Sequence, residues 1–384
     1  MLKHQLASIA LRTVTTRAVV MLRLRLEEQP APTGMKDIDM LLGWLLDTLG
    51  LVRRRNDADT YNSSTRPLHR LMRDHLLKEP MKGVDARVLS DQLEISMTAL
   101  HHHLKGLQAN RLIASKIGDN GWMMHHLRCG SLSAAIDLLY RESSGILKLR
   151  LAPLQHWQTG SVKRNYDEKC QELPLKLIIY EPHPLSDHED EIDAFLNDLG
   201  LRGERPKHRS GNDLTREVFE ALLEANHAIS LDEAVSQWGA TRPRLTRTFD
   251  RFRAAGLVER VPRHDRLTVI LWDAISTQYS RRGEEWLLGK GGLGRLDDKI
   301  AKLVIKSLKD GMFDSEKCAE IFSNVNEDEL RVTLNLLGGR LPHGYRLSGI
   351  SGEDVARQVM LRFESMFTRL KLVAEKLDEL GINN

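Results

Sequence analysis

Two stretches of this chain, residues 66–130 and 211–276, repeat one order of predicted elements: three helices followed by a β-hairpin. In the first stretch, helices over 68–77 and "DARVLSDQL" precede a third helix, and "RLIASKI" and "WMMHHL" flank the turn signal "GDNG". In the second, "LTREVFEALLEAN", "SLDEAVSQWG" and "TRPRLTRTFDRFRAAG" precede the predicted hairpin "LVERVPRHDRLTVILWD". The repetition predicts two small domains of the same design.

The third helix of each repeat has a start signal and an apolar face. Ser96 is a suitable N-cap for a helix whose inward positions are Leu100, Leu104 and Leu107. Thr241 takes the same place in the second repeat, where the inward positions are Leu245, Phe249 and Phe252. The opposite face of each helix is therefore expected to face solvent or a partner.

The rest of the chain divides into four further parts. Residues 1–62 and 295–350 follow the repeat more faintly, and residues 351–382 form one long helix. Residues 131–210 are predicted to be a mixed α/β connector domain, in which "ILKLRL" and "LPLKLIIY" look like strands. We expect a mainly α fold with small β-hairpins, of the α+β class.

Composition excludes several classes of protein. Apolar residues make up 41% of the chain, but no stretch reaches the roughly 18 apolar residues of a membrane span. Three cysteines, Cys129, Cys170 and Cys318, lie far apart with no CxxC pair, which excludes a disulfide scaffold and a zinc finger and favours a reducing cytoplasm. Residues 1–26 contain basic residues and no acid, so a transit peptide is the alternative to an ordinary helix and strand there.

The repeated unit resembles the winged helix-turn-helix superfamily. "LSDQLEISMTALHHHLKGLQANRLI" is similar to MarR- and ArsR-type regulators, and "WGATRPRLTRTFDRFRAAGLVER" has the same shape. The resemblance implies that the third helix enters the major groove of double-stranded DNA while the wing touches the backbone or minor groove. The DNA-contacting residues that it implies are Thr98, His101, His102 and Lys105 in the first unit, and Arg242, Arg244, Thr246, Arg247, Arg251, Arg253, Arg260, Arg263, His264 and Arg266 in the second.

Charge separates the two units. Residues 242–266 hold eight arginines and three acids, although the whole chain has 56 basic and 53 acidic residues. A basic helix and wing gain DNA affinity by releasing counterions, so we expect the second unit to dominate binding. The alternative is that these domains dock on proteins and that the arginine-rich face is only solvated.

The last helix carries a strict heptad pattern. From Ala356 to Leu380 the apolar positions advance by 3, 4, 3, 4, 3, 4 and 3 residues. The pattern favours self-association into a homodimer that would pair recognition helices across near-palindromic half-sites, and the alternative is docking on the protein's own core. The residues assigned to self-association are Val359, Phe363, Met366, Leu370, Val373 and Leu377.

No other motif supports a defined chemistry. The histidines at 101–103, the segment 123–129 and the acidic segment 183–193 match no standard metal pattern, and "GKGGLG" (289–294) lacks the end of a phosphate loop, which favours a flexible linker. We therefore expect no catalytic residue, metal or cofactor. The predicted function is sequence-specific DNA binding by a cytoplasmic, nucleoid-associated transcriptional regulator. The alternatives are a non-enzymatic interaction subunit of a chromosome-maintenance or transcription complex, and a replication or partition initiator.

Overall fold

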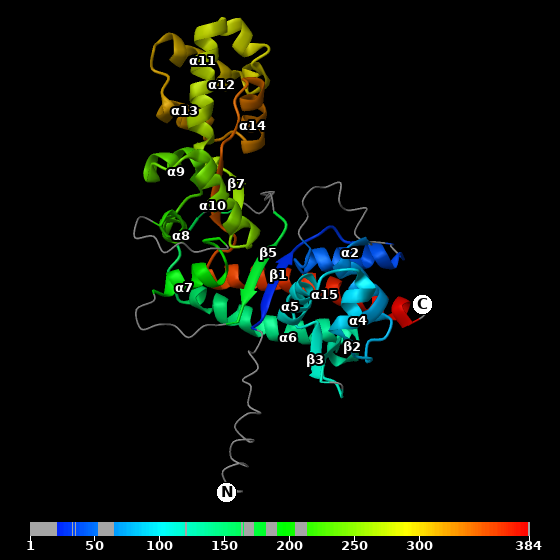
Figure 1. Cartoon of the computed structure of the whole chain (residues 1–384). Coiled ribbons are helices and arrows are strands. Elements are labelled where there is room, and N and C mark those ends of the chain that lie inside the picture. Colours follow the sequence, from blue (N-terminus) through cyan, green and yellow to red (C-terminus); the bar gives the residue numbers. More distant parts are fainter. Residues whose placement is uncertain are drawn as a thin grey trace.

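The computed structural model describes residues 21–32, 34, 36–52, 65–119, 121–162, 164, 173–181, 190–203 and 213–382 (Figure 1). Across these residues the fold is mainly helical with small antiparallel sheets, which confirms the α+β class. A large hydrophobic core holds most of the chain together, and a separate small core lies within residues 267–341.

The first unit contains the elements predicted for residues 66–130. Helix α3 (Pro67–Arg70) continues as the π-helix η2 (Leu71–Leu77), and it is followed by α4 (Ala86–Leu93) and α5 (Met97–Ala109). The hydroxyl of Ser96 accepts the capping hydrogen bond from the amide of Ala99, as predicted. The predicted hairpin is confirmed as β3 (Ile113–Ile117) and β4 (Met123–Leu127), and the short β2 (Val84–Asp85) joins it in the order β2-β4-β3.

The second unit has the same element order and the same sheet order. Helix α8 (Leu214–Glu224), β6 (Ile229–Ser230), α9 (Leu231–Trp238) and α10 (Arg242–Ala254) precede β7 (Val258–Pro262). The strands are arranged β6-β8-β7, with β8 (His343–Leu347) in the centre. The register pairs Arg260 of β7 with Tyr345 of β8.

The predicted hairpin of the second unit is wrong in its second strand. The segment "LTVILWD" does not return along β7 but begins α11 (Leu267–Leu288), and β8 supplies the pairing strand instead. Leu267, Leu271 and Ile275 recur every fourth residue and are buried together, so this apolar run is one face of a helix. The hairpin is therefore interrupted by about 80 residues.

We call residues 263–342, which separate β7 from β8, the helical insertion. It forms its own core from Leu271, Phe322 and Leu334 among others, and in Figure 1 it projects beyond the α9 end of the second unit. Its elements are η5 (His264–Arg266), α11, η6 (Leu293–Arg295), α12 (Asp298–Lys309), α13 (Ser315–Phe322) and α14 (Glu327–Leu336). Residues 295–350 are thus not a separate fainter copy of the unit, because their strand β8 belongs to the sheet of the second unit.

The segment "GKGGLG" is a close-packed turn and not a flexible linker. Gly292 has a φ of +80°, and a Cβ added there would lie 2.4 Å from Cδ1 of Leu336 in α14. A Cβ on Gly294 would lie 2.5 Å from the carbonyl oxygen of Leu288. Only glycine allows this approach between the end of α11 and α14.

The N-terminal and connector segments pair with each other. Strand β1 (Arg23–Glu27) lies antiparallel to β5 (Lys176–Tyr180), which confirms the strand predicted at "LPLKLIIY". Helix α2 (Ile38–Thr48) follows β1 in the chain, and α7 (Glu191–Asp198) follows β5. The strand predicted at "ILKLRL" is wrong, because these residues complete α6 (Leu132–Leu151), which η4 (Ala152–Gln155) follows. Within residues 1–62, the predictions for 1–20 and 53–62 lie outside the described residues.

The long C-terminal helix α15 (Gly352–Ile382) packs its apolar face against other parts of the same chain. It packs along α6, where Phe363 and Phe367 form an aromatic cluster with Tyr140. The carboxylate of Asp378 accepts hydrogen bonds from the amides of Leu132 and Ser133 at the start of α6, at 2.8 and 2.9 Å. The six residues assigned to self-association are all buried by the chain itself: Val359, Phe363, Met366, Leu370, Val373 and Leu377. That assignment is therefore corrected, and the alternative of docking on the protein's own core is what the helix does.

Helix α15 also connects the two units. Near its start, Val359 lies against Gly256, at the junction between α10 and β7. Near its end, Gly381 packs against Leu77 of η2. These contacts are 22 residues apart, which corresponds to about 33 Å of helix. The units thus contact opposite parts of one rigid element (Figure 1).

Candidate nucleic-acid interface

Helix α10 is held from behind by aromatic packing. The side chains of Leu245, Phe249 and Phe252 are fully buried, as the sequence predicted. Phe249 stacks on Tyr345 of β8 with 4.1 Å between ring centroids and 5° between ring planes. The ring centroid of Phe252 lies 5.6 Å from that of Phe219 in α8. This packing fixes which face of α10 is turned to solvent.

The solvent face of α10 carries three arginines. Arg244, Arg247 and Arg251 are exposed and advance by three and four residues, so they lie on one side of the helix over about 10 Å. No ion pair within the described part of the chain involves any of the three. The neighbouring Thr246 is partly exposed. This arginine face has positive charge that its described surroundings do not neutralise.

Arg242 and Arg266 are the other exposed arginines of the predicted site in the second unit. Arg242 is exposed at the start of α10 and is paired with Asp232 of α9. Thr241 occupies the N-cap position, but its side chain makes no capping hydrogen bond. Arg266 is exposed on η5, at the start of the helical insertion. In the second unit, the exposed arginines of the predicted site therefore lie on α10 and on η5.

Two of the predicted DNA-contacting arginines are buried and are not available to a ligand. Arg253 is 7% exposed, and its Nη1 donates a hydrogen bond to Asp250 at 3.1 Å. Arg263 is 3% exposed and is held by Asp265 and Glu233. Burial acts to lower the pKa of Arg263, but the hydrogen bonds to Asp265 and Glu233 outweigh it and raise that pKa. Both arginines are structural, which corrects the sequence assignment.

Two further wing residues also have partners inside the protein. His264 is mostly buried and is paired with Glu327 at the start of α14, so it anchors the helical insertion. Arg260 is partly buried on β7, opposite Tyr345. The wing of the second unit thus serves mainly as the base of the insertion. The sequence shows no signal for this, because the acidic partner Glu327 lies 63 residues away.

The first unit offers an exposed but weakly charged helix. Thr98, His101, His102 and Lys105 all lie on the exposed side of α5, as the resemblance implied. Burial lowers the pKa of the neighbouring His103 below its ordinary value. With a single lysine among its four predicted contact residues, this face has little electrostatic attraction for phosphate.

Other chemistry is limited in the described part of the chain. His125 is buried, its Nδ1 lies 2.8 Å from the hydroxyl of Ser115, and burial lowers its pKa to about 4. No group of three His, Cys, Asp or Glu side chains in the described residues could hold a metal ion. Cys170 and residues 183–189 of the acidic segment lie outside the described residues.

A second basic surface lies on α12, where the resemblance implied no contact. Lys299, Lys302, Lys306 and Lys309 advance by 3, 4 and 3 residues and are all exposed. That spacing is visible in the sequence and places the four side chains on one helix face. We call this set the α12 lysine row.

None of the described helices is long and apolar enough to cross a membrane. Comparisons with protein-family models, with curated proteins and with solved structures find no match to this chain.

Proposed function

We propose that this chain is a winged-helix protein that binds double-stranded DNA through α10 of its second unit. The arginine face of α10 carries the proposal, because three exposed guanidinium groups stand on a helix braced by Phe249 and Phe252. The shared order of three helices and a three-stranded sheet in both units supports the winged-helix assignment.

The chemistry of the face suits a duplex. Arginine has a planar fork that matches phosphate oxygens and the O6 and N7 atoms of guanine, and it keeps its charge at every physiological pH. Arg244, Arg247 and Arg251 would then divide between phosphate contacts, which supply affinity, and base contacts, which supply specificity. Arg242 is exposed at the start of the same helix.

A transcriptional regulator without enzymatic activity is the role we propose, by analogy with other proteins of this architecture. Each chain carries two units, and α15 joins them rigidly. A single chain therefore presents two potential recognition helices, α5 and α10, without a dimer formed through α15.

Binding of the full chain to random-sequence duplex DNA over a salt series tests the proposal. For Arg244→Ala/Arg247→Ala, we expect the slope of log K against log salt to become shallower by about one to two, since each lost phosphate contact contributes about 0.9. The matched control is Arg331→Ala/Arg340→Ala, which removes two exposed arginines from the insertion. Flat or undetectable binding of the wild type at low salt would refute the proposal.

A protein-docking role is the second candidate, and one observation favours it. At the apex of the first unit's hairpin, Ile117 is 61% and Trp122 is 44% exposed, and Val88 of the adjacent α4 is 45% exposed. The guanidinium of Arg87 lies 3.8 Å from the Trp122 ring centroid and holds this ring in place. Absence of DNA binding at low salt would favour this candidate, with the apex as the docking surface.

A further inference from the structure

The α12 lysine row is a fixed surface. Its helix is anchored by Ala301, Val304 and Ile305, which are buried in the core of the insertion. The carboxylate of Asp297 caps the helix by accepting a hydrogen bond from the amide of Lys299 at 2.7 Å. The lysine side chains extend from a helix that cannot rotate, so their direction is set by the fold.

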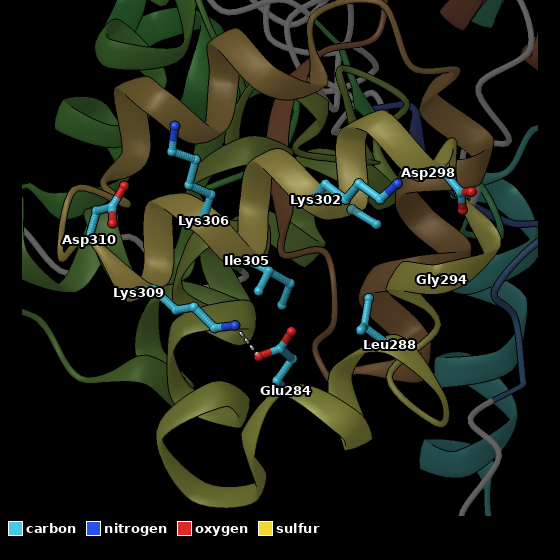
Figure 2. Close-up of a pocket in the computed structure, with 10 residues that line it drawn as sticks. Glu284, Leu288, Gly294, Asp298, Lys302, Ile305, Lys306, Lys309 and Asp310 are labelled. Atoms are coloured by element: carbon cyan, nitrogen blue, oxygen red, sulfur yellow. Dashed lines mark ion pairs between the residues drawn. The ribbon is translucent and has the colours of Figure 1, made fainter.

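Three of the four lysines are electrostatically available. Lys309 forms an ion pair of 2.7 Å with Glu284 of α11, and this hydrogen bond raises its pKa. In contrast, the described residues provide no ion pair to Lys299, Lys302 or Lys306. Figure 2 shows Lys309 turned toward Glu284 while Lys306 points the other way. Three of the row's four lysines are therefore held in no ion pair by the described residues of the insertion.

The pocket beside the row is a weaker candidate than the row itself. It has a volume of about 470 Å³ between α11 and α12, and Leu288 and Ile305 are apolar residues of its lining (Figure 2). Its charged lining balances, because three lysines are matched by three carboxylates: Lys302, Lys306 and Lys309 against Glu284, Asp298 and Asp310. A small anion held inside would gain little from this lining, whereas an extended polyanion outside would meet the unpaired lysines.

Charge in the insertion is distributed unevenly. The first turn of α14 contains Glu327, Asp328 and Glu329, and α13 exposes Glu316 and Glu320. Lys290 and Arg295 are exposed before α12, whose ends carry Asp298 and Asp310 beside the four lysines. The lysine row is thus a basic face of an insertion in which α13 and α14 expose mainly acidic residues.

The insertion holds α12 at a fixed offset from α10. It leaves the second unit at the end of β7 and returns at β8, so both of its ends lie in the sheet that packs against α10. Arg263 ties its base to Glu233 of α9, and the indole of Trp272 donates a 2.8 Å hydrogen bond to the carbonyl of Phe313 within it. Helix α11 is broken at Gly283, whose φ of +78° and ψ of −178° are not helical, so its continuous part (residues 267–282) is about 24 Å long.

We propose that the α12 lysine row is a second contact for the phosphate backbone of the duplex that α10 binds. Lys299 to Lys306 spans about 10 Å along the helix, over which one DNA strand presents about three phosphates. The number of unpaired lysines therefore matches the number of phosphates within reach. This inference rests on the proposed DNA binding by α10 and adds a contact outside the winged-helix unit.

The test is a salt series and a hydroxyl-radical footprint on a 40-base-pair duplex, with the full chain and Lys299→Gln/Lys302→Gln/Lys306→Gln. Glutamine is a good helix former, so α12 is retained. We expect the log–log salt slope to become shallower by about two to three. We also expect the footprint to lose its protection at one end while the α10 contact remains.

The matched control is Lys317→Gln/Arg331→Gln/Arg340→Gln, which removes three basic residues from the other helices and loops of the same insertion. Circular dichroism checks that both variants are folded. A lysine-row variant with the wild-type slope and footprint would overturn the inference, and so would an equal loss in the control, because net charge alone would then explain it. If Arg244→Ala/Arg247→Ala still flattens the slope, the proposed function stands without this second contact. If the wild type does not bind at all, both fail.

Discussion

Nη1 of Arg263 donates a hydrogen bond of 2.5 Å to Oε2 of Glu233, which lies 30 residues earlier in the chain. Glu233 is the N3 residue of a capping box, and the same Oε2 accepts a 2.8 Å hydrogen bond from the amide of Ser230. The start of α9 and the base of the helical insertion are therefore held by one carboxylate. This arrangement gives an arginine of the predicted DNA-binding wing a structural role.

Replacement of Arg263 should lower stability and leave the DNA contact intact. Arg263→Ala removes hydrogen bonds to two carboxylates, and bonds to charged groups contribute about 1.5–3 kcal/mol each. Because both carboxylates are partly exposed, we expect the low end of the sum, so that the free energy of unfolding in urea falls by about 3 kcal/mol. The salt slope of DNA binding by the folded variant should equal that of the wild type. The control Arg266→Ala removes an exposed arginine, so it should make the salt slope shallower and leave the stability unchanged. A shallower salt slope in Arg263→Ala with unchanged stability would contradict this assignment.

The stability of the first unit should decrease as the pH falls below the pKa of an ordinary histidine. Burial lowers the pKa of His125 to about 4, whereas an unfolded histidine titrates near 6.5. Between these values the unfolded chain binds the extra proton, so acid favours unfolding. His125→Gln removes this titration. We expect the wild type to lose roughly 2 kcal/mol more than the variant between pH 7 and pH 5, measured by urea unfolding.

A direct titration of His125 provides the check on that result. The imidazole resonances of His125 in the folded wild-type protein should still report a neutral ring at pH 5. A midpoint near 6.5 for His125 would show that burial does not control its charge.

Truncation of a buried side chain in the heptad pattern of α15 should destabilise the fold and should not dissociate a dimer. Phe363 is fully buried between α15 and α6, so Phe363→Ala should cost about 3–5 kcal/mol. Leu361→Ala alters an exposed position on the same helix and should change stability by less than about 0.5 kcal/mol. Urea unfolding measures both. Sedimentation at several concentrations provides the second readout, and a shift from dimer to monomer in folded Phe363→Ala would restore the self-association assignment.

A methyl group at Gly292 should destabilise the helical insertion. In Gly292→Ala the new Cβ would meet Leu336 at 2.4 Å, and the φ of +80° adds backbone strain. Gly311→Ala has a similar φ of +67° and open space around the Cβ, so it isolates the strain. We expect Gly292→Ala to cost about 1–3 kcal/mol more than Gly311→Ala, because overpacking is added. Equal thermal shifts in the two variants would show that the turn can relax.

Local signals predicted the individual elements well. Ser96 at an N-cap, "GDNG" between two apolar runs and the spacing of Leu245, Phe249 and Phe252 each depend on neighbours within a few residues. Such signals act through the helix period and through turn geometry, which the sequence shows directly. They were sufficient to locate both units and the exposed arginine face of α10.

Long-range pairing could not be predicted in this way. Strand β7 pairs with β8 some 85 residues later, and the apolar run "LTVILWD" looks equally like a strand when its helical partners are unknown. In "ILKLRL" the same ambiguity was resolved by packing, because Ile146, Leu147 and Leu151 are buried on one face of α6. Whether a short apolar segment forms a helix or a strand is thus decided by the elements against which it packs.

The tertiary structure also decided which charged residues are free. In the sequence, Arg247 and Arg263 belong to one basic segment, but Arg247 is exposed on α10 while Arg263 lies buried between Glu233 and Asp265. The heptad pattern of α15 showed that one face would be covered, and only the position of α6 showed that the chain covers it itself. Periodicity states that a face is apolar, whereas the partner of that face is a property of the whole fold.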